Sequence, residues 1–222
     1  MRTLFLALLA LFLWPRPARA EQTQLSLRLW CELDPMVQDS EDYPLSDEEA
    51  RRRILEEARF LLSGMIYGFD FLYTPADARR GIEEEFTLAP VAEVLWSDPN
   101  LRITDAYLQD AFLFVKIYYD LEDFQVARRR AWASTAITAS TGVGKHSIFT
   151  DPAPVGKRRA LEEAMKQAIR NALRPVHFNQ PREITGELVI WEQPRTVIRS
   201  GAYTTELTLK LRVKELRPYS LF

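Results

Sequence analysis

Residues 156–173, GKRRALEEAMKQAIRNAL, carry the clearest helical signal in the chain. Their apolar side chains recur every three to four positions, which is the spacing of one buried helix face. Four side chains on this face are alanines, and such small side chains would let the helix lie close to a sheet. Pro175 ends the helix, because proline disfavours helical geometry at the residue before it.

A second helix is predicted over residues 51–66, RRRILEEARFLLSGMI. Ser46 followed by Glu49 is a capping-box pattern just upstream of it. At an offset of 106 positions, six of eight aligned residues are identical between the two helices. Each helix also precedes two β-type runs, so the sequence favours a duplicated unit. The alternative is that charged, alanine- and leucine-rich helices resemble one another by composition alone.

Residues 1–20 are predicted to be a secretory signal peptide. An arginine at position 2 precedes an apolar run at 4–14, and residues 18–20, ARA, form a small-x-small cleavage site. The apolar run is too short to cross a bilayer as a helix. We therefore expect a periplasmic protein that is not integral to the membrane after cleavage. An uncleaved anchor is the alternative to cleavage, because two more arginines lie near the cleavage site. An outer-membrane or membrane-associated location is the alternative to the periplasm.

The chain contains one cysteine, so it forms no internal disulfide. Cys31 lies in an alternating apolar run over residues 25–33, which predicts the first strand. In that pattern Cys31 is expected to be a small core side chain and not a nucleophile. Residues 28–30, RLW, are not the small residues that precede a lipid-modified cysteine, so we expect no lipid anchor there.

Further strands are predicted at 86–96, 111–119, 126–138, 188–191, 196–199 and 205–213, whereas the Gly/Ser/Thr-rich residues 139–150 are predicted to be a loop or hairpin tip. Pro90 interrupts the first of these strands and favours an edge position or a bulge. This order predicts an α+β fold of two similar β-α-β-β modules, residues 21–122 and 123–222, with helices on one face of an antiparallel or mixed sheet. One continuous domain is the alternative.

No cofactor, metal or catalytic site is predicted. Residues 141–145, TGVGK, resemble a phosphate loop, but Ala139 and His146 stand where that motif needs glycine and serine or threonine. The two histidines, His146 and His177, lie near no second histidine or cysteine at metal-ligand spacing. The whole chain has a net charge of −2, which becomes about −5 if residues 1–20 are removed, so nucleic acid is not an expected partner.

Two arginine clusters, residues 51–53 and 128–130, suggest either binding of an anionic glycan or lipid headgroup, or pairing with acids such as those at 83–85. Aromatic side chains gather at residues 67–73, which makes them candidates for contact with a small ligand or glycan.

The helix at 157–172, with a Gly/Ser/Thr-rich segment before it and paired strands after it, resembles the LPP20-type lipoproteins and the amino-terminal module of the flagellar T protein. The likeness covers about residues 126–213 and lacks the lipoprotein cysteine. It implies an accessory protein of the envelope or flagellum without catalysis, and it transfers no site residues.

Three functions follow as hypotheses. The first is a non-enzymatic periplasmic or cell-envelope protein, in one version flagellum-associated, that acts through a protein partner of the envelope or the flagellar apparatus. The second is a module that binds a small ligand or glycan through residues 67–73. The third is a hydrolase that uses acidic residues and His146.

Overall fold

A computed structural model describes residues 23–35, 43–174 and 181–219. The predicted signal peptide and His177 lie outside these ranges. Helices and antiparallel strands both occur, so the predicted α+β class is confirmed. In chain order the elements are β1 (Gln24–Glu32), α2 (Asp47–Ile66), β2 (Phe69–Thr74), β3 (Glu85–Pro90), β4 (Leu101–Gln109), β5 (Phe112–Asp120), α3 (Asp123–Trp132), β6 (Thr138–Ser147), α4 (Val155–Leu173), β7 (Glu183–Ile190), β8 (Arg195–Arg199) and β9 (Ala202–Arg217).

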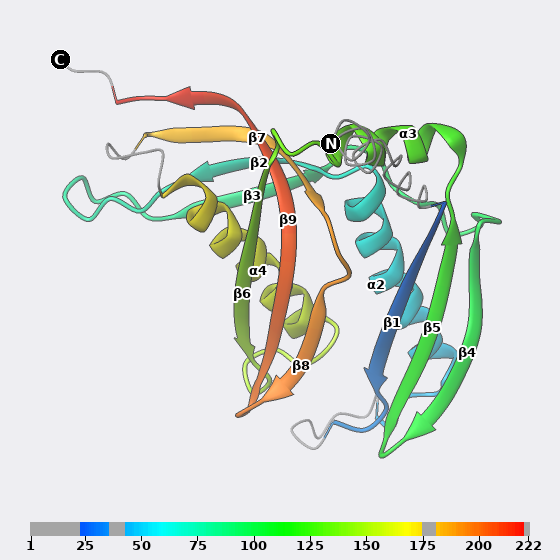
Figure 1. Ribbon diagram of the computed structural model, residues 1–222. Coiled ribbons are helices and arrows are strands. Elements are labelled where there is room, and N and C mark those ends of the chain that lie inside the picture. The colour runs from blue at the N-terminus through cyan, green and yellow to red at the C-terminus, as the bar shows by residue number, and fades with distance from the viewer. Residues whose placement is uncertain (1–22, 36–42, 175–180, 220–222) are drawn as a thin grey trace, which may run out of the picture.

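The strands form two sheets. One has the order β1-β5-β4, and the other has the order β3-β2-β7-β9-β6 with β8 also paired to β9. All pairs are antiparallel. The long strand β9 pairs with β6 on one side and with β8 and then β7 on the other. Figure 1 shows the three-stranded sheet standing beside the larger one, with α2 between them and α4 across the larger sheet. The predicted edge position of β3 is confirmed.

Helix α2 is the element that both sheets cover. It contacts β1 and β5 of the small sheet and β7 of the large sheet. The six residues 61–66 are all buried, so its last turns have no exposed side. The Ser46 side chain accepts a hydrogen bond from Glu49 N at 3.2 Å, which is the first half of the predicted capping box. The Glu49 carboxylate binds Arg52 and Arg53 instead of completing the box. One core cluster takes residues from α2, α4 and both sheets.

Helix α4 packs very closely on β6. Ala160, Ala164 and Ala168 are fully buried and face Gly142 and Gly144 of the strand. A Cβ atom on Gly144 would stand 2.1 Å from the Ala160 carbonyl oxygen, and one on Gly142 would stand 2.0 Å from that of Ala164. The expectation that the alanines permit a close approach to a sheet is confirmed. The glycines opposite them are equally necessary.

Residues 139–150 were predicted to be a loop, and this prediction is wrong, because residues 138–147 form β6. Glycine and serine composition is typical of loops, but here the glycines leave room for α4. The prediction of a strand at 126–138 is also wrong. Its first part belongs to α3, where Glu122 and Gln125 form a capping box around the first turn. Strand β4 was not predicted at all, and almost all of its residues are exposed.

The two helices that resemble each other in sequence have different surroundings. Helix α2 is covered by two sheets, whereas α4 lies on one. The strand before α2 belongs to the small sheet, while the two strands after it join the large sheet beside β7. Residues 51–66 and 156–173 are similar in sequence, but the structure does not show a duplicated unit around them.

The contact between α4 and β6 gives a stability prediction. Replacing Gly144 with alanine puts a methyl group into helix backbone, which cannot move aside without shifting α4. We expect Gly144→Ala to lower the free energy of unfolding by about 1–3 kcal/mol or more, measured by urea denaturation. Val143→Ala is the matched control, because Val143 is 49% exposed on the same strand and should change stability by less than about 0.5 kcal/mol. Equal stability of the two variants would contradict this packing.

Candidate functional site

A cleft of about 1280 Å³ opens where the small sheet meets the large one. Its walls come from β1, β4 and β5, from α2, from the start of α4, and from residues 193–197 at β8. Sites for single small molecules usually enclose about 300–1,000 Å³, so this cleft has room for a ligand of several linked units.

The two sheets meet below the cleft along a line of hydrogen bonds, here called the seam. These bonds join the free edge of β1 to Lys157 of α4 and to residues 193–196. Gln193 Oε1 accepts from Arg28 N at 3.2 Å, and Gln193 Nε2 donates to Arg28 O at 2.8 Å. Lys157 Nζ donates to Trp30 O at 2.8 Å, and Trp30 Nε1 donates to Thr196 O at 3.0 Å. Side chains thus occupy edge positions that a further strand would otherwise use.

Two neighbouring rows of side chains cross the cleft face of the small sheet. In one row Phe114 pairs in register with Trp30 on one side and Tyr107 on the other. The rings of Tyr107 and Phe114 are stacked, with centroids 5.2 Å apart and planes at 14°. In the adjacent row Lys116 pairs in register with Arg28 on one side and Asp105 on the other, so the row holds two cations and one acid. An aromatic row therefore lies beside a row that carries positive charge.

The cleft is positively charged although the whole chain is slightly acidic. Seven lysines and arginines line it against four carboxylates. One of these carboxylates, Glu57, is already paired with the buried Lys157 at 2.5 Å. The guanidinium carbon of Arg158 lies 3.0 Å from the centroid of the Phe60 ring. Burial lowers the pKa of Arg158, but an arginine remains protonated at neutral pH.

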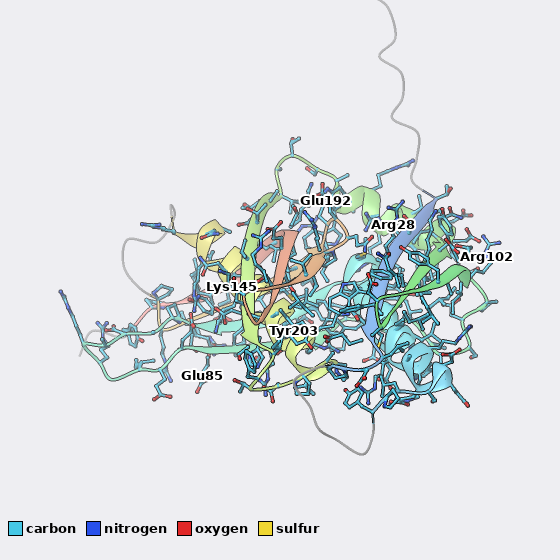
Figure 2. The ribbon with its side chains drawn as sticks, turned by 90° about the horizontal axis from the view of Figure 1, so that it is seen from below. Arg28, Glu85, Arg102, Lys145, Glu192 and Tyr203 are labelled. Carbon is cyan, nitrogen blue, oxygen red and sulfur yellow. The ribbon has the colours of Figure 1, made fainter. Side chains whose placement is uncertain are left out.

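Behind the cleft a polar cluster fixes the segment that leads into α4. Tyr203 Oη donates to Glu32 Oε2 at 2.7 Å and accepts from Ala153 N at 2.9 Å. Burial and the carboxylate of Glu32 raise the pKa of Tyr203 well above its usual range. Figure 2 shows Tyr203 near the middle of the molecule, while Arg102 lies toward its periphery. These bonds hold the segment before α4 against β1 and β9. Neither Tyr203 nor Glu32 lines the cleft.

Comparisons with known proteins give a family and no activity. A protein-family model, which carries no functional description, matches residues 14–219. The chain belongs to this family. It is also similar to a protein of Treponema pallidum (strain Nichols) described as an uncharacterized protein, with 24% identity over 210 residues, 93% of this chain and 86% of the relative. No solved structure matches the chain.

Membership of this family corrects the resemblance drawn from residues 126–213. Neither the family model nor the Treponema relative points to the LPP20-type lipoproteins or to the flagellar T protein. The helix and the element order that suggested them are features that many α+β proteins share. A role in the flagellum therefore has no support. No helix in the described ranges is long and apolar enough to cross a membrane.

Arginines of both clusters make contacts within the fold, and Arg53 of the first cluster also lines the cleft. Arg128 and Arg129 donate to the carbonyl oxygens of Tyr67 and Met65, each at 2.6 Å. Those carbonyls lie at the end of α2, where helical partners are lacking and positive charge is favourable. In the first cluster, residues 51–53, the second and third arginines bind Glu49.

The sequence suggested that the acids at 83–85 pair with the arginine clusters, but Glu84 pairs with α4 instead. Glu84 binds Arg170 of α4 and also lies 3.3 Å from Lys166, so it ties the segment before β3 to that helix. Burial acts against the charged form of Glu84, but Arg170 and the Tyr73 hydroxyl outweigh it and lower the pKa of the carboxyl.

The remaining candidates from the sequence lie apart from the cleft. His146 Nε2 lies 2.8 Å from Asp151 Oδ2. The aromatic rings of residues 67–73 mostly face the core, since Phe69, Phe71 and Tyr73 are at most 5% exposed. Cys31 is buried, which raises the pKa of its thiol to about 11 and keeps it protonated at neutral pH.

Of the candidate residues named from the sequence, Arg53 lines the cleft. Sequence reasoning missed the other residues that form it. It used the alternation in residues 25–33 only to find the buried face of a strand. The other face of the same strand carries Arg28 and Trp30, and the alternation itself predicted which positions point that way. What the sequence did not supply was the register that sets them beside Lys116, Phe114 and Tyr107.

Proposed function

We propose that this protein is exported and acts without catalysis in the cell envelope by binding a saccharide in the cleft. One observation carries the proposal: aromatic and charged side chains line an open cleft of about 1280 Å³. Three candidate nucleophiles or bases are not offered to the cleft, although the carboxylates of Asp105 and Glu162 line it. Cys31 and Tyr203 are buried with raised pKa values, and His146 lies apart from the cleft.

A saccharide fits the cleft better than an extended peptide. Peptides often bind by adding a strand to a free sheet edge. On β1 the backbone of Arg28 is already bonded to Gln193 and the carbonyl of Trp30 to Lys157. Recognition must then come from side chains. The apolar faces of sugar rings can pack on the stacked rings of Tyr107 and Phe114 through dispersion.

Export is tested by the amino terminus of the protein made in its own cells. We expect periplasmic extract to contain a chain that begins at Glu21, identified by mass spectrometry, because a signal peptidase would cut after residue 20. A variant lacking residues 2–20 should stay in the cytoplasmic fraction. Recovery of the intact chain in the membrane fraction would indicate the anchor alternative, and recovery in the cytoplasm would contradict export.

Binding is tested with oligosaccharides released from bacterial envelopes. They should raise the Tm of the wild-type protein, because a ligand that binds only the folded state stabilises it. Tyr107→Ala should weaken binding by about two- to twelvefold, since an aromatic contact contributes about 0.5–1.5 kcal/mol. Phe124→Ala, at a residue that is 57% exposed on α3 outside the cleft, should bind like the wild type. Equal Tm shifts in both variants would exclude the cleft.

A second candidate function, contact with an envelope protein, is favoured by strand β4. This strand is an edge of the small sheet (Figure 1), and all its residues after the first are exposed. Ile103 and Leu108 are 40% and 61% exposed and lie in register with the core residues Ile117 and Leu113. An open edge with an apolar face suits a partner that adds an extended strand with alternating apolar residues.

A photo-crosslinking residue placed at Leu108 tests this second function in intact cells. We expect a single covalent product with one other protein, and we expect its loss when Ile103 is also replaced by lysine, which removes the apolar face. The same crosslinker at Phe124 serves as the control. A product containing only two copies of this chain would show self-association instead, and equal products from both positions would rule out β4 as a specific surface.

A further inference from the structure

We infer that the cleft selects acidic saccharides, whose carboxylate or phosphate groups meet the positive row beside the aromatic row. This inference rests on the proposed saccharide-binding function and adds the chemical class of the ligand. Its basis is the arrangement of charge inside the cleft, which is opposite in sign to the net charge of the chain.

Most of the positive charge in the cleft is not neutralised by the protein. Within the described ranges no ion pair joins a carboxylate to any of five lining cations, namely Arg28, Lys116, Arg158, Arg159 and Arg195. The carboxylates Glu56 and Glu57 are occupied by Arg52 and Lys157. Only Asp105 and Glu162 remain to balance the five, so an anion entering the cleft meets a net attraction.

Arg158 is the cation placed most favourably for an anion. It is partly buried against Phe60. Burial disfavours its charged form, and the nearby carboxylates of Glu162 and Glu57 offset only part of this effect. No side-chain hydrogen bond of its guanidinium is found in the described part of the chain. A buried charge without acceptors is costly. A carboxylate or phosphate offers two oxygens that match the planar fork of arginine, which a neutral hydroxyl group does not.

The positions of Arg28 and Lys116 connect the charge to the aromatic row. These two residues are paired in register and stand one row away from Trp30, Phe114 and Tyr107 on the same face. Asp105 completes their row, and Lys116 Nζ lies 4.8 Å from the centroid of the Tyr118 ring. A sugar ring packed on the aromatic row would therefore direct an acidic substituent toward them. Figure 2 shows Arg28 on β1, whereas Lys145, another exposed cation, lies on β6 of the other sheet.

The inference is tested by calorimetric titration of the full chain with defined probes. The carboxylate arm uses oligogalacturonate and its fully methyl-esterified form. The phosphate arm uses phosphorylated oligomannose and the same sugar after phosphatase treatment. We expect at least one acidic probe to bind ten times more tightly than its neutral form or better, with an affinity that falls as salt rises. The arm that binds identifies which acid the cleft prefers.

Charge variants locate the effect. Lys116→Gln and Arg158→Gln should each weaken binding of the acidic probe by about fivefold or more. The loss of affinity for the neutral probe should be much smaller. Lys145→Gln removes the same charge outside the cleft and should bind like the wild type. Urea unfolding of each variant shows whether it is folded. If Arg158→Gln unfolds, Lys116→Gln decides the result alone, because the Lys116 side chain makes no ion pair in the described ranges.

The outcomes separate this inference from the function on which it rests. Neutral and acidic probes that bind equally, with a loss in Tyr107→Ala, would overturn the preference for acids and leave saccharide binding intact. If Lys116→Gln and Lys145→Gln lost equal affinity for the acidic probe, the preference of the cleft for acids would also be overturned. The effect would then come from the net charge of the chain. Failure of every probe, together with the absence of any Tm shift with envelope oligosaccharides, would overturn both.

Discussion

The burial of α2 between two sheets is the constraint on which the rest of the structure depends. The last turns of this helix are mostly apolar and buried on every side, so other elements must cover them on more than one side. The small sheet covers it with leucines of β1 and varied apolar side chains of β5, and the large sheet covers it from β7. The end of the helix is closed by the arginines of α3, which donate to its last carbonyls. Two sheets are therefore held beside each other by one helix.

This arrangement brings two sheet edges together without joining them. Strand β1 approaches β8, but Gln193 and Lys157 occupy the backbone groups through which the sheets could have paired. The seam fixes the distance between the sheets, and the cleft is the space that remains above it. Its chemistry comes from the outward faces of strands whose inward faces make the core. A single alternation thus supplies both the leucines that cover α2 and the aromatic and positive rows of the candidate site.

The glycines of residues 141–145 show how tertiary contacts can change the meaning of a motif. In isolation the segment resembles part of a phosphate loop, or a flexible hairpin tip. In the fold its glycines lie in a strand under α4, where a single methyl group would meet helix backbone at 2.0–2.1 Å. The alanine face of the helix and the glycines of the strand are two halves of one contact. They are separated along the chain, so neither predicts the other.

The sequence by itself determined the α+β class, helices α2 and α4, the strands at Gln24–Glu32 and Phe112–Asp120, and the place of Cys31 in the core. These features follow from contacts between residues two to four positions apart, which periodicity records. Only the tertiary structure decided that residues 138–147 are a strand, that the strands divide into two sheets, and that Trp30 faces β8. Those outcomes depend on partners as far apart as Trp30 and Thr196, 166 positions along the chain, and no local pattern encodes such a pairing.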